Sequence, residues 1–311
     1  MADVVITEFM DEAAVDLIRA RHSVHHDPAL ADRQDDIPGL IADARALIVR
    51  NRTQVTDALL AAGPKLEAVG RLGVGLDNID MAACKARNVT VFPATGANAI
   101  AVAEYVIATA LVLVRGAYRS SERLVGGEFP RAEFTGGELY GRRLGLVGFG
   151  GIAREVAFRA RALGMTISAY DPFVAADDPV WEGVERVDDI DRLAADSDVI
   201  SLHVPLTDAT RNLFGAKTIA AMKDRAILIN TARGGIIDEP ALVAALKAGT
   251  LGGAAIDVFA SEPLNAETGA TFADCPNLIL TPHIGGLTDE ANERVSHLTA
   301  ENVLKALEAG R

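Results

Sequence analysis

The chain has 311 residues, 50% of them hydrophobic and 23% charged, which suits a globular enzyme of two domains. Its formal net charge of -13 argues against non-specific nucleic-acid binding, because phosphate contacts need clustered lysine and arginine side chains. No apolar run reaches the roughly 18 residues of a membrane span, and Asp3 and Glu8 lie where a secretory signal would be basic, so we expect a cytoplasmic protein without membrane contact.

Short β-branched runs alternate with helix-like stretches in the first third of the chain. The predicted strands lie at residues 4–9, 46–50, 67–72 and 89–93, and the predicted helices at 11–20, 56–63 and 78–88. Strands that alternate with helices form parallel sheets with crossover connections. In residues 96–127 apolar side chains recur three and four positions apart, which predicts one long connecting helix that ends at Gly126 and Gly127.

A second alternating series begins at residue 143. Its six predicted strands lie at residues 143–151, 165–171, 198–204, 226–232, 253–258 and 277–283. Six such strands are what a doubly wound dinucleotide-binding fold requires, so the predicted class is α/β with Rossmann-like domains and parallel sheets. Residues 288–310 predict a final amphipathic helix with Thr288 as its N-cap.

The strand at 143–151 runs into a glycine-rich turn, GFGGIA, and then into a helix. Gly148 would permit the tight turn, and Gly150 would let the backbone approach a pyrophosphate at the helix N-terminus. Such a turn alone could be a plain strand-to-helix connection. Asp171 stands 23 positions after Gly148, where a carboxylate can bind the ribose hydroxyls and repel a 2′-phosphate. The pattern therefore favours NAD over NADP, with a turn before Pro172 as the alternative role of Asp171.

Polar side chains follow the last three predicted strands. They are Arg233, the carboxylates Asp257 and Glu262, and His283. Ligands of open α/β sheets bind at the carboxyl ends of strands, so we expect one shared site, although each residue alone could be structural. An arginine fork binds a carboxylate or polarises a ketone, and a histidine held by a carboxylate moves a hydroxyl proton. This set suits the oxidation of a secondary alcohol beside a carboxylate.

Several stretches resemble the D-isomer-specific 2-hydroxyacid dehydrogenase family, in order and across nearly the whole chain. They are GRLGVGLDNID, GANAIAVAEYVIATAL, GLVGFGGIA, HVPLT, NTARGGIIDE, AIDVFASEP and TPHIGG. The resemblance implies that Arg233 binds substrate, that His283 is the acid/base and that Glu262 is its partner. It implies NAD-site residues Gly148, Gly150, Gly151, Ile152, Asp171, Ala232, Asp257 and Gly286. It also implies that backbone N–H groups of Leu72, Gly73, Val74 and Gly75 hold the substrate carboxylate.

The same resemblance implies a domain organisation. Residues 1–97 and 287–311 would form a discontinuous substrate-binding domain and residues 98–286 an NAD-binding domain, with closure over the cleft and a homodimer. A tryptophan common before the fingerprint strand is absent, and Phe129 stands in that region. No regulatory domain follows Arg311, so feedback inhibition through such a domain is not expected.

Three arginines, Arg50, Arg52 and Arg71, are candidates to bind the end of the substrate opposite its carboxylate. The stretches that contain them are similar to those of phosphoglycerate and sulfolactate dehydrogenases, and three guanidinium groups near one cleft would stabilise a second anion. We therefore expect NAD-dependent oxidation of a D-type 2-hydroxy acid such as 3-sulfolactate, or the reverse reaction, with 3-phosphoglycerate as the alternative. Each arginine could instead face solvent or pair with a carboxylate.

Other protein classes remain as alternatives. Corepressor-like family members bind NAD without catalysis and keep the same arginine, glutamate and histidine. Formate dehydrogenases move a hydride without an acid/base, and Glu262 argues against that chemistry. A metal-dependent alcohol dehydrogenase would need clustered ligands, whereas Cys84 and Cys275 lie far apart without a metal-binding spacing, so no metal is expected.

Overall fold

The computed structural model describes residues 2–309 and divides the chain into two compact units. Unit 1 combines the N-terminal segment through Asn98 with the segment from Leu287 onward, and unit 2 spans Ala99–Gly286. Residues 1, 310 and 311 lie outside the described residues. Residues 1 and 311 are the outer limits expected for the substrate-binding domain, and residue 310 is the expected end of the last helix. Each unit has its own sheet and its own buried core.

Unit 1 contains a five-stranded parallel sheet of order β2-β1-β3-β4-β5. Its strands are β1 (Val4–Ile6), β2 (Val24–His26), β3 (Ala46–Val49), β4 (Ala68–Arg71) and β5 (Thr90–Pro93). The four predicted strands are present, and β2 is an addition at the edge of the sheet. Its sequence Val-His-His is half-buried and has only one aliphatic residue, so it lacks the apolar run that marks a strand.

Two layers of helices cover the sheet of unit 1. The helices are α1 (Glu12–Arg19), α2 (Ile37–Ile41), α3 (Asp57–Ala62), α4 (Met81–Ala86) and α12 (Asp289–Ala309), with short 3₁₀ turns at Pro28–Asp32 and Gln34–Asp36. Apolar residues of α1 and α12 share one core with the sheet, and those of α2, α3 and α4 share the other. The predicted cap of α12 is confirmed, because the Ala291 N–H donates to Thr288 Oγ1 at 3.0 Å.

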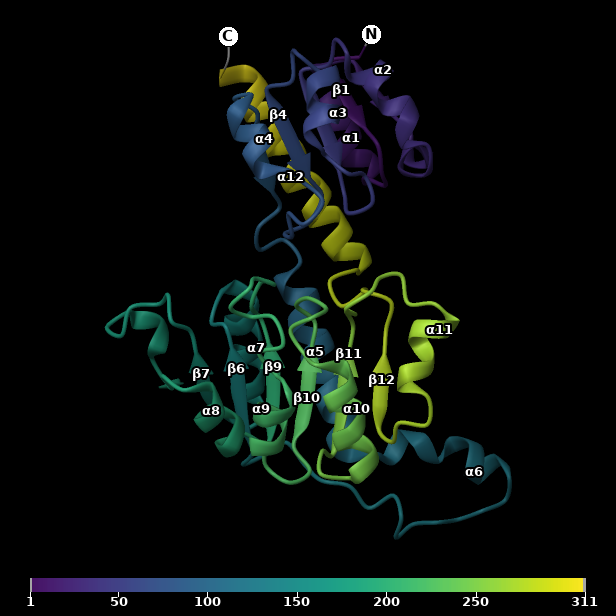
Figure 1. Cartoon of the computed structure of the whole chain (residues 1–311), viewed down its shortest axis with the longest axis vertical. Coiled ribbons are helices and arrows are strands. Elements are labelled where there is room, and N and C mark those ends of the chain that lie inside the picture. Colours follow the sequence, from purple (N-terminus) through teal and green to yellow (C-terminus); the bar gives the residue numbers. More distant parts are fainter. Residues whose placement is uncertain (1, 310–311) are drawn as a thin grey trace. The chain divides into compact units, whose positions relative to one another are not determined.

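Unit 2 contains a seven-stranded parallel sheet of order β12-β11-β10-β9-β6-β7-β8 (Figure 1). Its strands are β6 (Arg143–Val147), β7 (Thr166–Tyr170), β8 (Glu185–Arg186), β9 (Val199–Leu202), β10 (Ile227–Asn230), β11 (Gly253–Ile256) and β12 (Leu278–Leu280). All six predicted strands are present, and β8 is too short for a sequence pattern to reveal. The strand order reverses between β6 and β9, which confirms the doubly wound class.

Helices pack on both faces of the sheet of unit 2. They are α5 (Ala99–Arg115), α6 (Ser121–Val125), α7 (Gly151–Ala162), α8 (Ile190–Asp196), α9 (Ala216–Ala221), α10 (Glu239–Ala248) and α11 (Ala266–Gly269), with 3₁₀ turns at Ala117–Ser120, Pro179–Trp181 and Ala270–Phe272. One core contains residues of α5 and α7, and the other contains residues of α8, α9 and α10. Crossover helices on both faces bury the central strands β9, β10 and β11 fully, whereas the edge strands β8 and β12 are only partly buried.

The single long helix predicted at residues 96–127 is wrong in its second half. Helix α5 ends at Arg115, and Gly116 adopts a left-handed conformation with φ 66°, which glycine reaches without strain. A 3₁₀ turn and the short helix α6 follow across a bend of 60°. In the described part of the chain no single helix is long and apolar enough to cross a membrane, and α5 with residues 117–125 meets those criteria only as a bent pair.

Candidate active site

The polar residues that follow the last three strands meet at one edge of the unit 2 sheet. Strand β11 pairs in parallel with β10 on one side and with β12 on the other. The segments that follow these strands therefore leave the sheet at the same edge. Arg233 belongs to the segment after β10, Asp257 directly follows β11, and His283 lies three residues after β12.

The imidazole of His283 is held by Glu262. His283 Nδ1 lies 2.8 Å from Glu262 Oε2, and Glu262 Oε1 accepts a hydrogen bond of 2.9 Å from the Phe259 N–H. An ionised carboxylate can only accept, so Nδ1 carries the proton and the neutral ring keeps a lone pair on Nε2. The His283 side chain is 44% exposed, which leaves the ring accessible to a small molecule.

The carboxyl group of Glu262 remains ionised to acid pH. Burial alone would raise its pKa, but the hydrogen bonds from His283 and the Phe259 N–H, with the positive charges of His283 and Arg233, hold the pKa below the ordinary 4.5. Glu262 is therefore an acceptor for His283 throughout the neutral range. The positive charge of Arg233 makes the smallest of these contributions.

Asp257 anchors the loop that carries His283. Its Oδ1 accepts the Ile284 N–H at 2.8 Å, its Oδ2 accepts the Gly285 N–H at 2.7 Å, and its backbone carbonyl accepts the His283 N–H at 2.8 Å. Three successive N–H groups thus bind one residue, which is itself only 1% exposed. This anchoring is needed because His283 has a φ of 56°, a left-handed conformation that is unfavourable for a bulky side chain.

Two hydroxyl groups extend the anchor into helix α5. Thr281 Oγ1 donates to Asp257 Oδ1 at 2.6 Å, so the Tyr105 hydroxyl, 2.6 Å from Thr281 Oγ1, must be the donor to it. Burial raises the pKa of Tyr105, which keeps this donor protonated. The sequence motifs did not reveal Tyr105 or Thr281, because the contact between them joins residues 176 positions apart.

Arg233 lies in a turn whose shape is set by Asn230. The buried Asn230 amide accepts the Ala232 N–H at 3.0 Å and donates to the Arg233 carbonyl at 2.9 Å. The next residue must be glycine, because a Cβ on Gly234 would lie 1.7 Å from the Phe259 carbonyl oxygen. The turn after β10 is therefore packed directly against the segment between Asp257 and Glu262.

The glycine-rich turn after β6 has the shape of a dinucleotide cradle. Gly148 has a φ of 86°, and a Cβ there would lie 2.5 Å from the His203 carbonyl oxygen, so only glycine fits. A Cβ on Gly150 or Gly151 would meet no atom within 4 Å, which leaves space beside the start of α7. No side chain caps this helix N-terminus, so its N–H groups can bind a pyrophosphate.

Asp171 joins the end of β7 to this cradle. Its Oδ2 accepts the Phe149 N–H at 2.8 Å, and its Oδ1 accepts the Phe173 N–H at 2.9 Å. Each carboxylate oxygen has a second lone pair that can accept from a ribose hydroxyl. The cradle and Asp171 therefore fit NAD. The other expected NAD-site residues lie at the start of α7 and in the two loops described above: Ile152, Ala232 and Gly286.

His203 follows β9 and is a much weaker base than an ordinary histidine. Burial lowers the pKa of His203 to about 4, so its ring is neutral at neutral pH. Cys84 is also an unsuitable nucleophile, because burial, with the nearby Asp80, raises the pKa of its thiol. Both residues are therefore weaker candidates for proton transfer than His283.

The predicted carboxylate-binding turn, Leu72 to Gly75, follows β4 in unit 1. Gly73 has a φ of 149°, and a Cβ there would lie 1.8 Å from Arg71 Nη1. Arg71 Nη1 also donates to the Leu72 carbonyl at 2.7 Å, so the guanidinium crosses directly over the turn. Leu72 is buried, whereas Val74 lies at the surface. The φ of Gly73 is what favours glycine there, because the Arg71 guanidinium is the end of a flexible side chain and could move aside.

Arg50 and Arg52, the other two arginines expected near the second anion, differ in their surroundings. Arg50 Nη2 donates to Asn292 Oδ1 at 2.7 Å, and burial lowers its pKa although the charge of Glu8 opposes that effect. Arg52 is exposed and forms an ion pair with Asp32. Strands β3 and β4 are neighbours, and Val49 is in register with Arg71, so Arg50 and Arg71 leave the sheet at the same edge.

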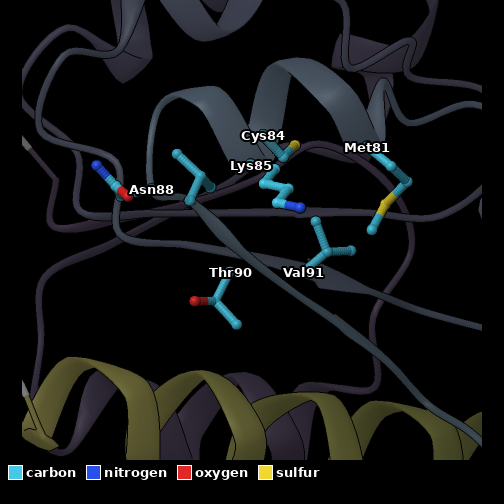
Figure 2. A pocket seen from close by; sticks show the side chains of 7 residues that line it. Met81, Cys84, Lys85, Asn88, Thr90 and Val91 are labelled. Atoms are coloured by element: carbon cyan, nitrogen blue, oxygen red, sulfur yellow. The ribbon is translucent and has the colours of Figure 1, made fainter.

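Two cavities in the described residues lie away from these side chains. One of about 390 Å³ lies between α4 and β5, lined among others by Met81, Lys85 and Thr90 (Figure 2). The other, of about 630 Å³, lies beside the C-terminal end of α5, around Arg115 and Arg225. Neither contains a predicted site residue. No group of three or more potential metal ligands occurs in residues 2–309.

Comparisons with known proteins give the same assignment. Residues 107–285 match the family model of the D-isomer specific 2-hydroxyacid dehydrogenase NAD binding domain. The chain is 52% identical over 307 residues to an (S)-sulfolactate dehydrogenase of Chromohalobacter salexigens, and the match covers 99% of both chains. It is 39% identical to a D-3-phosphoglycerate dehydrogenase of Methanocaldococcus jannaschii, where the match covers 99% of this chain but only 58% of that protein.

A solved structure of a 2-hydroxy acid dehydrogenase also resembles this chain over nearly its whole length. The D-lactate dehydrogenase of Aquifex aeolicus, in complex with NAD and lactic acid, has a TM-score of 0.82 and 30% identity, and the match covers 98% of this chain and 96% of that one. The fold, the NAD-binding motif and the full-length similarity agree. The chain belongs to the D-isomer-specific 2-hydroxyacid dehydrogenase family and is an NAD-dependent oxidoreductase.

Proposed function

We propose that His283, Glu262 and Arg233 catalyse the NAD-dependent oxidation of a 2-hydroxy acid of D configuration to the 2-oxo acid, or the reverse reaction. The hydrogen bond between His283 Nδ1 and Glu262 Oε2 supports this proposal most strongly, because it leaves Nε2 free to take the hydroxyl proton. Glu262 stabilises the imidazolium that forms. Arg233 binds the substrate carboxylate and polarises the developing ketone. NAD, when bound, accepts the hydride.

The natural substrate in this proposal carries a second anion, with (S)-3-sulfolactate first and 3-phosphoglycerate second. The similarity to the sulfolactate dehydrogenase supports this choice, and so do Arg50, Arg52 and Arg71 of unit 1. The label (S) agrees with the D configuration. At the hydroxyl-bearing carbon of sulfolactate the sulfonate-bearing group outranks the carboxylate, so (S)-sulfolactate has the same spatial arrangement as D-lactate.

The pairing of Arg52 with Asp32 does not prevent this role. Both side chains are exposed, and an exposed ion pair is weak because water screens it, so a substrate anion can displace Asp32 at little cost. Arg50 and Arg71 supply the remaining positive charge. In this proposal unit 2 carries the chemistry of the reaction, and unit 1 carries the recognition of the second anion.

Substrate profiling tests the proposal. Initial rates of NADH formation should be measured with (S)-3-sulfolactate, (R)-3-sulfolactate, D-3-phosphoglycerate and D-lactate. We expect the highest kcat/KM for (S)-3-sulfolactate and little turnover of the (R) form. Arg52→Ala should raise the KM for sulfolactate but leave D-lactate kinetics unchanged. Equal turnover of D-lactate and the doubly anionic acids would rule out second-anion recognition, and no NADH with any acid would favour a non-catalytic NAD-sensing protein.

Replacing Glu262 by glutamine should affect both rate and acid stability. We expect kcat to fall at least about tenfold, because the amide does not stabilise an imidazolium. The folded-state pKa of Glu262 lies below 4.5, so its ionised form stabilises the fold at neutral pH, and that contribution disappears as the pH falls below about 4.5. In urea unfolding, the wild type should therefore be more stable than Glu262→Gln at neutral pH and similar to it at acid pH. A difference that grew on acidification would contradict this assignment.

Asp171 should set the preference between the two nicotinamide cofactors. Asp171→Asn keeps one acceptor for the backbone but loses the charge that binds ribose hydroxyls and repels a 2′-phosphate. We expect kcat/KM for NAD to fall about tenfold or more, and that for NADP to rise. Asp188→Asn, at an exposed position of the same unit, is the matched control. If the ratio of NAD to NADP activity were unchanged in Asp171→Asn, the role of Asp171 would be only to stabilise the turn before Pro172.

We also propose a homodimer in the cytoplasm. Val125 and Phe129, which are 90% and 77% exposed, lie in or just after α6, and Figure 1 shows this segment standing away from the unit 2 sheet. Apolar side chains so exposed favour burial against a second copy. The free thiols of Cys84 and Cys275 suit a reducing compartment. Sedimentation should give twice the chain mass of 32.7 kDa, and the mass of a single chain at micromolar concentration would exclude the dimer.

A further inference from the structure

Glu8 has an unusual environment in unit 1. Its side chain is buried, with 4% of the residue exposed, and it accepts hydrogen bonds from the backbone N–H groups of four consecutive residues, 50 to 53. Oε1 accepts from Arg50 at 2.8 Å and from Thr53 at 3.0 Å, and Oε2 accepts from Asn51 at 3.3 Å and from Arg52 at 3.1 Å. This carboxylate therefore fixes the whole turn that follows β3.

The position of this contact in the sheet is that of a ligand site. The order β2-β1-β3-β4-β5 reverses direction between β1 and β3, and Glu8 follows β1 whereas the turn follows β3. Open α/β sheets bind ligands at such switch points, and successive N–H groups form a nest for anions. In this chain a carboxylate of its own occupies the nest. The anion at this point is thus structural, and it organises the groups around it.

The turn that Glu8 holds carries Arg50 and Arg52. The Arg50 guanidinium is further fixed by Asn292 Oδ1, at 2.7 Å from Nη2, and by the ring of Phe9, whose centroid lies 5.9 Å away. A fixed guanidinium recognises an anion with less loss of side-chain entropy than a mobile one. Glu8 thus fixes the backbone of Arg50. Phe9, the residue after Glu8, helps to fix the position of the Arg50 guanidinium.

The Thr53 end of the turn is also held by contacts that do not involve Glu8. Asn78 Nδ2 donates to the Thr53 carbonyl at 2.7 Å, and Thr53 Oγ1 lies 2.8 Å from Thr7 Oγ1. Asn78 belongs to the segment just after the carboxylate-binding turn, and its backbone carbonyl accepts the Val55 N–H at 2.8 Å. The two segments of unit 1 that the substrate is proposed to contact are therefore joined, with Glu8 holding the one after β3.

We propose that Glu8 is a positioning residue for recognition of the second anion of the substrate, acting through the turn at residues 50–53 and the side chain of Arg50. This inference depends on the proposed function, because it presumes that Arg50 binds that anion. Glu8 itself is buried beneath the turn and does not touch the substrate. Its replacement should therefore change substrate discrimination and leave hydride transfer intact.

Glutamine and aspartate at position 8 test this in different ways. Glu8→Gln keeps the length but turns an NH₂ group toward backbone N–H donors, so the turn must move. Glu8→Asp keeps the charge but is one methylene shorter, so it cannot reach the same N–H groups. Both variants should raise the KM for (S)-3-sulfolactate about tenfold, while the KM for NAD and kcat/KM for D-lactate stay within about twofold. Glu12→Gln, an exposed position on α1, is the control.

A double-mutant cycle with Arg50 separates positioning from general destabilisation. If Glu8 acts through Arg50, the variant that combines Glu8→Gln with Arg50→Ala should have the same sulfolactate KM as Arg50→Ala alone. Melting temperatures of all variants should be recorded, with assays at a temperature where each is folded. Glu8→Asp provides the test if Glu8→Gln does not fold.

Several results would overturn the inference. An unchanged or lowered sulfolactate KM in both Glu8 variants would mean that the turn needs no such anchor or that Glu8 only repels the substrate. Equal losses with sulfolactate and D-lactate would indicate a merely structural role, and additive effects of Glu8→Gln and Arg50→Ala would show that Glu8 does not act through Arg50. If Arg50→Ala itself leaves the sulfolactate KM unchanged, the proposed second-anion recognition by Arg50 fails, and the positioning role of Glu8 fails with it.

Discussion

Replacing His283 by alanine is expected to lower kcat at least about 100-fold, which is the usual loss when a general acid/base is removed. The reason is the fixed ring: Nδ1 is engaged by Glu262, which leaves Nε2 as the atom that is proposed to take the hydroxyl proton. The other imidazole described in unit 2, that of His203, is a poor replacement, since desolvation lowers its pKa to about 4. The Kd for NAD should stay within about threefold, because His283 acts on the substrate.

Steady-state rates and fluorescence titration with NAD would measure these two effects. His297→Ala, which removes an imidazole from α12 in unit 1, is the matched control and should behave as the wild type. A His283→Ala enzyme with wild-type turnover would show that proton transfer occurs elsewhere. A parallel loss of NAD binding would instead show that the loop anchored by Asp257 had collapsed.

Replacing Arg233 by alanine should reduce both substrate affinity and rate, with a fall in kcat/KM of about 100-fold or more. Asn230 fixes the turn that carries Arg233, and the positive charge of Arg233 contributes, as the smallest cause, to the lowered pKa of Glu262. Arg233→Lys keeps the charge without the planar fork and should recover only part of the loss. The effect should be similar for D-lactate and sulfolactate, since both have the carboxylate.

The control for this variant is Arg192→Ala, at an exposed position on α8. If Arg233→Ala impaired sulfolactate but not D-lactate, Arg233 would recognise the second anion and not the carboxylate. If it impaired neither, the site would have to be reassigned. Comparison with Arg52→Ala on the same two substrates therefore separates the roles of the two arginines.

The two sheets, and the polar residues that follow the strands of unit 2, could be predicted because their signals are local. Apolar runs mark β6, β9, β10 and β11, and the rule that ligands bind at the carboxyl ends of strands selects the residues that follow them. Thr288 was predictable as a cap because its hydroxyl contacts an N–H only three residues away. The strands β2 and β8 were not predictable, since neither has an apolar run.

Contacts between distant residues explain what the sequence could not reveal. The Glu8 carboxylate binds residues 42 to 45 positions away, and no local pattern distinguishes it from a surface glutamate. The Tyr105 contact with Thr281 and the pairing of Arg52 with Asp32 are of the same kind. Asp257 was expected beside the nicotinamide, and the structure adds that its carboxylate anchors the His283 loop. The end of α5 at Gly116 was missed because the apolar spacing continues past it.

The most direct test of hydride transfer by this chain uses (S)-3-sulfolactate with deuterium on its hydroxyl-bearing carbon. The wild type should transfer that deuterium to NAD, giving labelled NADH and sulfopyruvate in equal amounts, as mass spectrometry can measure. His283→Ala should form the same labelled product far more slowly. Unlabelled NADH, or no reduction of NAD by the wild type under conditions where NAD binds, would contradict the proposed reaction.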